Sequence, residues 1–283
     1  MPKDYTPITA GEEPAAGLLG TWWRQPPHVV RKVEYAPYKE HDVRLVTVQA
    51  DVLAATGDRT TFYSPREEPG LLTALLDVAQ EKLKPVAFAD RYGLLGYNYI
   101  VPQANRSKGG DPLAWFIAHA RTALLVSDLI LCLKEARESS GGRRNLANYL
   151  AEIPDGPFAL GGWVGEIRLR TGSSNPILAA TGILRYLLNA NLGSTGRRLQ
   201  SSERGLRTVF TFRALIEVVY WELADQVGQS EIHRCRECGR IFVHANKKAS
   251  YCPPTGGQKT SRCKSRWLVR EFRKRKDLKR RKR

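Results

Sequence analysis

The sequence predicts an α+β protein, in which an α-rich N-terminal domain with a small sheet is followed by a small cysteine-rich C-terminal module. Three observations support this prediction. Apolar residues recur at helical spacing through much of residues 1–228, four of the five cysteines fall within residues 235–263, and positive charge is concentrated after residue 230. A chain of 283 residues is long enough for one medium and one small domain. We therefore expect domains at residues 1–228 and 231–283.

The N-terminal part is expected to begin with an ordered but mostly irregular segment, because residues 1–40 are rich in Pro and Gly. The adjacent Trp22 and Trp23 could form an aromatic platform for nucleic acid, but we favour a role in fixing this segment to the core. Alternating apolar and polar residues predict a strand over residues 43–48, and weaker patterns predict strands over residues 59–63, 97–101 and 162–170.

Helices are predicted from apolar spacing and from capping residues. Asp111-Pro112 and Asn175-Pro176 each place a good N-cap before a proline at the first helical position. We expect a polar, basic loop over residues 196–205 and a hinge at residues 228–230. The predicted helices span residues 71–83, 111–135, 143–152, 176–192 and 206–227.

The sequence contains no evident signal for secretion or membrane insertion. The N-terminus lacks the apolar core of a signal peptide, and the most apolar segment, residues 113–133, is interrupted by His119, Arg121 and Asp128. We therefore expect a soluble, cytoplasmic protein with no membrane partner. Cys132 lies among apolar residues of this segment, and we interpret it as a small buried side chain rather than a reactive thiol.

Cys235, Cys238, Cys252 and Cys263 follow the pattern C-x2-C-x13-C-x10-C. A pair of thiolates two residues apart can bind one ion from a tight turn, two further thiolates complete a tetrahedron, and Gly239 suits the turn. The sequence thus predicts one structural Zn²⁺ ion, because four thiolates leave no open position for a water. The alternatives are a pair of disulfides, a weak or vestigial site, and a redox C-x-x-C motif. A redox motif would not need the other two cysteines.

The module should be a treble-clef-like zinc finger. We expect a knuckle at Cys235 and Cys238, then two short strands around a polar turn, then a helix from about residue 260 whose first turn donates Cys263. Trp267, Leu268 and Phe272 should form an apolar stripe that packs on the strands. His233 and His244 flank the knuckle and are alternative ligands, which four available thiols make unnecessary.

The charge distribution indicates a polyanionic partner. The segment from Glu231 to the C-terminus has 19 Lys and Arg and 4 acidic residues, a formal charge of +15 of the chain's +17. Nucleic acid is the commonest intracellular polyanion, although a solvated basic tail remains the simpler alternative. The candidate nucleic-acid-binding residues are Lys247, Lys248, Arg262, Lys264, Arg266, Arg270, Arg273 and Lys274, of which the four arginines are expected on one helix face.

The C-terminal residues resemble the CGNR-type zinc fingers of bacterial proteins that carry an N-terminal ABATE domain and are regarded as stress-related transcription regulators. The resemblance covers about 50 residues: the C-x-x-C knuckle, Phe242, the Tyr251-Cys252 pair and a last cysteine followed by a basic helix. The family signature Cys-Gly-Asn-Arg reads Cys263-Lys264-Ser265-Arg266 here. The resemblance implies four cysteine ligands and an N-terminal sensor or interaction domain.

Together these features predict a zinc-finger nucleic-acid-binding protein and, by the resemblance, a DNA-binding transcription regulator, with DNA favoured over RNA. The alternative is a zinc-stabilised protein-interaction or RNA-binding module. We expect no enzyme activity, because the histidines show no catalytic spacing and the chain has neither a P-loop nor a G-x-G-x-x-G motif. The sequence carries no signal for an oligomeric state.

Overall fold

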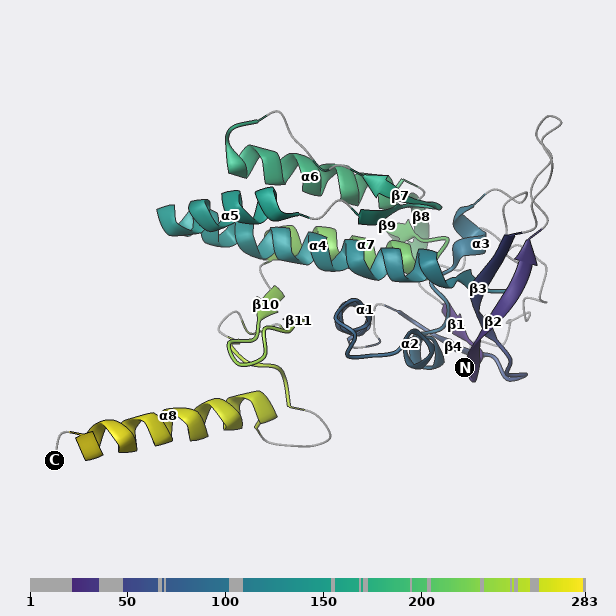
Figure 1. Ribbon diagram of the computed structural model, residues 1–283. Helices are drawn as coiled ribbons and strands as arrows, with labels where there is room; N and C mark the ends of the chain where they lie inside the picture. Colours follow the sequence, from purple (N-terminus) through teal and green to yellow (C-terminus); the bar gives the residue numbers. More distant parts are fainter. Residues whose placement is uncertain are drawn as a thin grey trace.

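The computed structural model describes residues 22–35, 48–65, 68, 70–101, 109–153, 156–167, 169, 173–193, 195–202, 205–229, 232–244, 246, 249–254 and 260–281. In these residues the chain forms a mixed α/β body with small antiparallel sheets, and one helix near the C-terminus projects from it (Figure 1).

A three-stranded sheet lies at the N-terminal end of the body. β2 (His28–Tyr35) pairs with β3 (Val48–Ala55), and β5 (Asp111–Pro112) joins the other edge of β3. Residues 43–47 of the first predicted strand lie outside the described residues.

A second small sheet joins β1 (Trp22–Arg24) to β4 (Thr61–Tyr63). Residues 22–24 and 28–35 thus form regular strands where we expected an irregular segment, because each strand pairs with a later one. The expected core role of Trp22 is confirmed: its side chain is buried, and its indole N–H donates to the carbonyl oxygen of Leu94 at 3.1 Å.

Helices α1 (Leu71–Ala79), α2 (Pro85–Tyr92) and α3 (Tyr97–Ile100) follow. α3 corrects the strand predicted at residues 97–101. The buried carboxylate of Asp111 accepts the backbone N–H groups of Leu95 at 2.5 Å and of Tyr97 at 2.8 Å, which satisfies donors at the start of this helix. The expectation that Asp111 caps the next helix was therefore wrong.

The long helix α4 (Leu113–Glu138) runs through the centre of the body, and α5 (Ser140–Glu152) and α6 (Pro176–Asn191) pack beside it (Figure 1). By length and composition α4 could cross a membrane, but 72% of its apolar window is buried inside the protein, as in the core helix of a soluble protein. The predicted cap of α6 is confirmed, since the Asn175 side chain accepts two backbone N–H groups.

Two hairpins and a further helix complete the body. β6 (Gly156–Leu160) pairs with β7 (Trp163–Ile167), and β8 (Gly196–Ser202) pairs with β9 (Gly205–Thr211) before α7 (Leu215–Gln229).

The second hairpin corrects both the loop predicted at residues 196–205 and the early start predicted for the last body helix. Residues 208–212 are β-branched or aromatic without exception, a composition that favours a strand over a helix. The hinge is corrected as well, because Gly228 and Gln229 belong to α7.

The cysteine-rich module comprises β10 (Ile232–Arg234), β11 (Ile241–Val243) and α8 (Arg262–Arg281). β10 pairs with β11 across the knuckle, whereas we expected both strands after it. Ile232 and Ile241 are each 1% exposed and belong to the main hydrophobic core of the body. The hairpin is thus built into the body, while α8 stands apart from it (Figure 1).

Candidate metal centre

The four cysteines that the sequence singles out come together at one point. The Sγ atoms of Cys235, Cys238, Cys252 and Cys263 all lie within 4.8 Å of one another. A tetrahedral ion with metal–sulfur bonds of about 2.3 Å needs sulfurs about 3.8 Å apart, so the arrangement fits a single metal ion. Soft thiolate ligands favour ions such as zinc or copper(I) over magnesium or calcium.

The first two ligands lie on a tight turn between the paired strands. The N–H of Cys235 donates to the carbonyl oxygen of Arg240 at 2.9 Å, and the N–H of Gly239 donates to that of Cys235 at 2.9 Å. Gly239 has φ of 71°, a left-handed conformation in which a Cβ is strained. The turn expected at this glycine is confirmed, and it points both thiols of the C-x-x-C pair to one side.

The electrostatics of the thiols favour a bound cation. Burial opposes ionisation of Cys235, but backbone N–H groups of Cys238, Cys252 and Glu237 donate to its sulfur and lower its pKa to about 7. Burial and the neighbouring thiols raise the pKa of Cys252. Burial and the thiol of Cys238 raise the pKa of Cys263 to about 11. One thiolate therefore forms readily, whereas several together need a positive charge among them.

Helix α8 begins at the metal centre. Ser261 is its N-cap: the side chain accepts the N–H of Lys264 at 3.0 Å, and the carbonyl oxygen accepts that of Ser265 at 3.0 Å. Cys263 follows in the first turn, where the positive end of the helix dipole faces the sulfurs. Bound thiolates and the start of α8 thus stabilise each other.

Two ion pairs join this module to the body. The Arg240 guanidinium binds both carboxylate oxygens of Asp77 on α1, one of them at 2.6 Å through Nε. Arg234 pairs with Asp128 on α4. Arg240 also interacts with the sulfur of Cys252, so its charge is shared between the body and the metal centre. Sequence reasoning missed Asp77 and Asp128, because nothing in a local pattern connects acids more than 100 residues away to the cysteines.

Two of the alternatives for the cysteines, a redox motif and a pair of disulfides, fit the geometry poorly. The C-x-x-C pair lies between two strands, not at the start of a helix as in a thioredoxin-like motif. Cys238 and Cys252 have sulfurs 3.5 Å apart, well beyond the length of about 2.05 Å of a disulfide bond. Cys132 is half-buried and burial raises its pKa to about 11, as expected for a packing side chain.

Both flanking histidines are engaged away from the sulfurs. His233 stacks on Phe242, and its Nε2 lies 3.1 Å from the carbonyl oxygen of His244. His244 accepts the N–H of Asn246 at its Nδ1. The preference for cysteine ligands over these histidines therefore agrees with the geometry.

The candidate nucleic-acid residues divide into two groups on α8. Arg262, Lys264, Arg266 and Arg273 are exposed. Arg270 instead pairs with Glu237 of the knuckle, and Lys274 lies 3.4 Å from Glu271. The helical spacing keeps the four arginines on one side of α8, as expected, but the pairing with Glu237 engages Arg270 within the module. Lys247 and Lys248 lie outside the described residues.

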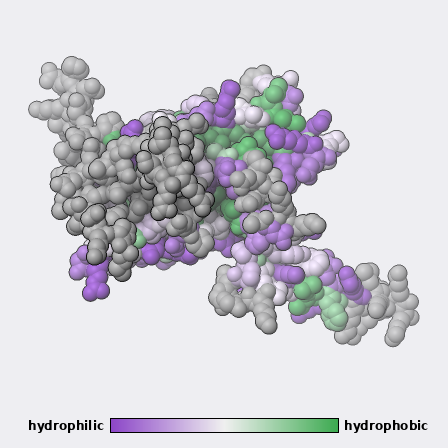
Figure 2. Space-filling view, turned by 180° about the vertical axis from the view of Figure 1, so that it is seen from behind, coloured by the Kyte–Doolittle hydropathy of each residue, from purple (hydrophilic) through white to green (hydrophobic). Residues whose placement is uncertain are grey.

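The apolar stripe of α8 is also different from our expectation. Trp267 packs against Tyr251, with ring centroids 5.6 Å apart. Leu268, Val269 and Phe272 are 49%, 50% and 68% exposed. Figure 2 shows this apolar patch on the projecting helix with hydrophilic residues around it. Spacing along α8 could not show that the rest of the module covers only one side of the helix.

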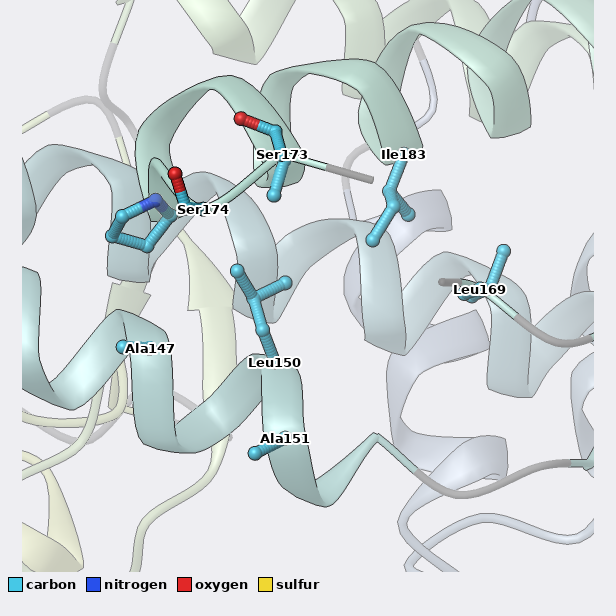
Figure 3. Close-up of a pocket in the computed structure, with 9 residues that line it drawn as sticks. Ala147, Leu150, Ala151, Leu169, Ser173, Ser174 and Ile183 are labelled. Atoms are coloured by element: carbon cyan, nitrogen blue, oxygen red, sulfur yellow. The ribbon is translucent and has the colours of Figure 1, made fainter. Parts of the chain in front are cut away.

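A depression of about 320 Å³ lies between α5 and α6 (Figure 3). Leu150 and Ile183 line it from the two helices, with Ser173 and Ser174 at one end. Its lining contains no charged group and no histidine or cysteine.

No family model, no curated protein and no solved structure matches this chain. The metal centre and the surface of α8 are therefore the features that indicate a function.

Proposed function

We propose that this protein binds nucleic acid through α8, and that one structural zinc ion at the four cysteines holds this helix in place. Under this proposal the module is a treble-clef-like finger of the CGNR type, and the body is an ABATE-like sensor or interaction domain. The protein would be a DNA-binding transcription regulator without catalytic activity.

The observation that carries the proposal is the position of Cys263. The last ligand lies in the first turn of α8, so a bound ion fixes the helix that carries the exposed Arg262, Lys264, Arg266 and Arg273. Four thiolates with one ion form a closed site, which is typical of structural zinc. Basic side chains on a rigid helix can neutralise phosphates without a large loss of conformational entropy.

The exposed Leu268, Val269 and Phe272 favour one second candidate function. The module could be a zinc-stabilised protein-interaction surface for an acidic partner, since exposed apolar groups are typical of interfaces. A protein partner that is recovered by this protein after nuclease treatment, and that is lost with Phe272→Ala, would favour this alternative.

The proposal is tested by measuring bound zinc and then comparing duplex DNA, single-stranded DNA and RNA as ligands of the purified protein. Removing residues 262–283 deletes α8 but keeps the hairpin that belongs to the core of the body. We expect this truncation to lose most of the affinity for duplex DNA. Undiminished affinity in the truncated protein would contradict the assignment to α8.

A further inference from the structure

One side of α8 is held against the rest of the module, and the opposite side is open to a ligand. Residues of a helix advance by about 100° each around its axis. Cys263, Trp267 and Arg270 therefore lie on one side, and all three contact the rest of the module, at the metal centre, Tyr251 and Glu237 respectively. The opposite side is the one that a ligand can approach without displacing the module.

Leu268, Val269 and Phe272 lie on that opposite side, which we call the apolar tip. Basic residues flank the apolar tip on both edges. Arg262, Arg266 and Arg273 follow one edge, and Lys264 and Arg275 follow the other. All five basic side chains are exposed. A ligand for this surface should therefore present an apolar group between two rows of negative charge.

The major groove of duplex DNA has this arrangement. It is about 12 Å wide and admits an α-helix of about 10–12 Å diameter, with a phosphate backbone on each side. The apolar group that base pairs present on the floor of this groove is the 5-methyl group of thymine. A second copy of this chain would instead bring two strongly positive modules together, which their charge opposes.

We propose that α8 enters the major groove with the apolar tip against thymine methyl groups, while the two basic edges contact the two phosphate backbones. This inference rests on the proposed function and adds base preference to it. Leu268 and Phe272 are four residues apart, a rise of about 6 Å, so they cover about two successive base pairs.

The test uses two 20-base-pair duplexes of alternating adenine and thymine, one of which carries deoxyuridine at every thymine position and so lacks only the methyl groups. Fluorescence anisotropy of the zinc-loaded full chain at one salt concentration should show tighter binding to the thymine duplex, by about fourfold for each methyl covered. Phe272→Ala should lose most of this difference while its salt dependence stays unchanged, because no phosphate contact is removed.

The matched control is Tyr186→Ala, which removes a similarly exposed aromatic ring from α6 in the body. It should keep the wild-type preference for thymine, and bound zinc should be equal in all three proteins. Arg266→Gln should show the reverse pattern. It should keep the preference for the thymine duplex, and the slope of log affinity against log salt concentration should fall by about 0.9, the value for one phosphate contact.

Equal binding of the two duplexes by the wild type, or an unchanged preference in Phe272→Ala, would overturn the inference. If the two duplexes bound equally but their binding remained steeply salt-dependent, the proposed function would stand without the preference for thymine. If neither duplex bound at any salt concentration, both would fail. A change in the sedimentation of free protein by Phe272→Ala, without a change in duplex preference, would make the apolar tip an interface between protein chains and would also overturn the inference.

Discussion

The β10–β11 hairpin and α8 belong to the same cysteine-rich module, but they are stabilised in different ways. The hairpin places Ile232 and Ile241 in the core of the body and is joined to α1 and α4 by two ion pairs. α8 contacts the rest of the module through Cys263, Trp267 and Arg270, and most of its other described side chains are exposed. The metal centre lies between them, with two ligands in the turn of the hairpin, Cys252 in the segment that follows it, and Cys263 in α8.

This difference indicates that the hairpin is stabilised by the body and α8 by the metal ion. Burial of Ile232 and Ile241 in the core of the body stabilises the hairpin without metal. The hairpin therefore holds Cys235 and Cys238 on a rigid support. α8 has little apolar burial of its own, and we expect the bound ion to supply most of its stability. Changes at the metal centre should consequently affect α8 far more than they affect the body.

The largest expected effect is that of removing the metal. Structural zinc contributes on the order of 10 kcal/mol to the folding of small modules, so chelation or Cys252→Ala should free α8 while α4 remains folded. Hydrogen exchange should become much faster in α8 and stay slow in α4. The control is Cys132→Ala, which should leave both helices unchanged. Equal exchange in α8 with and without metal would show that the ion does not hold this helix.

Ile241 tests whether the hairpin belongs to the body. Ile241→Ala should lower the free energy of unfolding of the whole protein by about 2–5 kcal/mol, because it leaves a cavity in the main core. Its metal affinity should fall too. Leu268→Ala, on the exposed side of α8, should change stability by less than about 0.5 kcal/mol. Chemical denaturation of the two variants would contradict the comparison if the two losses were similar.

Replacing Asp77 tests the ion pair with Arg240 that joins the cysteine-rich module to α1. The side chains of Arg240 and Asp77 are 23% and 13% exposed, and Asp77→Ala leaves the guanidinium without its partner. We expect a loss of about 2–4 kcal/mol in the free energy of unfolding, together with weaker metal binding. Glu271→Gln removes the exposed pair with Lys274 and should cost about 0–0.5 kcal/mol. Similar values for the two variants in denaturant titrations would contradict the structural role of Arg240.

The body should also show a pH dependence that does not involve the metal centre. Burial lowers the pKa of His119 from 6.5 to about 3, and its ring nitrogens lie near Tyr220 and Gly161. The unfolded chain therefore binds a proton that the folded chain excludes, and stability falls as the pH is lowered from about 6.5 towards about 3.

His119→Asn should remove this contribution, so its free energy of unfolding should depend less on pH in that window than that of the wild type. The measurement is denaturant unfolding at a series of pH values, read as the difference between the two proteins. This difference cancels the opposite trend of Asp111, whose pKa burial raises to about 6. Parallel pH profiles would rule out His119 as the titrating group.

The features that could be predicted from sequence are those set by local spacing. The ligand set follows from the distances between cysteines, the start of α6 from Asn175-Pro176, and the turn from Gly239. At two places where prediction failed, the deciding contact lay elsewhere in the sequence. The carboxylate of Asp111 stabilises the start of α3, and β4 pairs with β1 across some 40 residues of chain.

The surface of α8 also shows what local spacing cannot predict. Helical spacing correctly groups Leu268 with Phe272, but it does not determine whether a partner covers them. Arg270 was grouped with the free arginines by spacing alone, although Glu237 of the knuckle neutralises it. Which side of a helix is buried depends on the tertiary position of the hairpin, which local patterns do not encode.

The most direct test of the central claim is the salt dependence of duplex DNA binding by the zinc-loaded chain. If α8 neutralises phosphates with the exposed Arg262, Arg266 and Arg273, the logarithm of the affinity should fall with the logarithm of salt concentration at about 0.9 per phosphate contacted. Replacing these three arginines with glutamine should reduce that slope by about three contacts, and chelating the metal should abolish most of the binding. A flat salt response, or full binding without metal, would contradict the account.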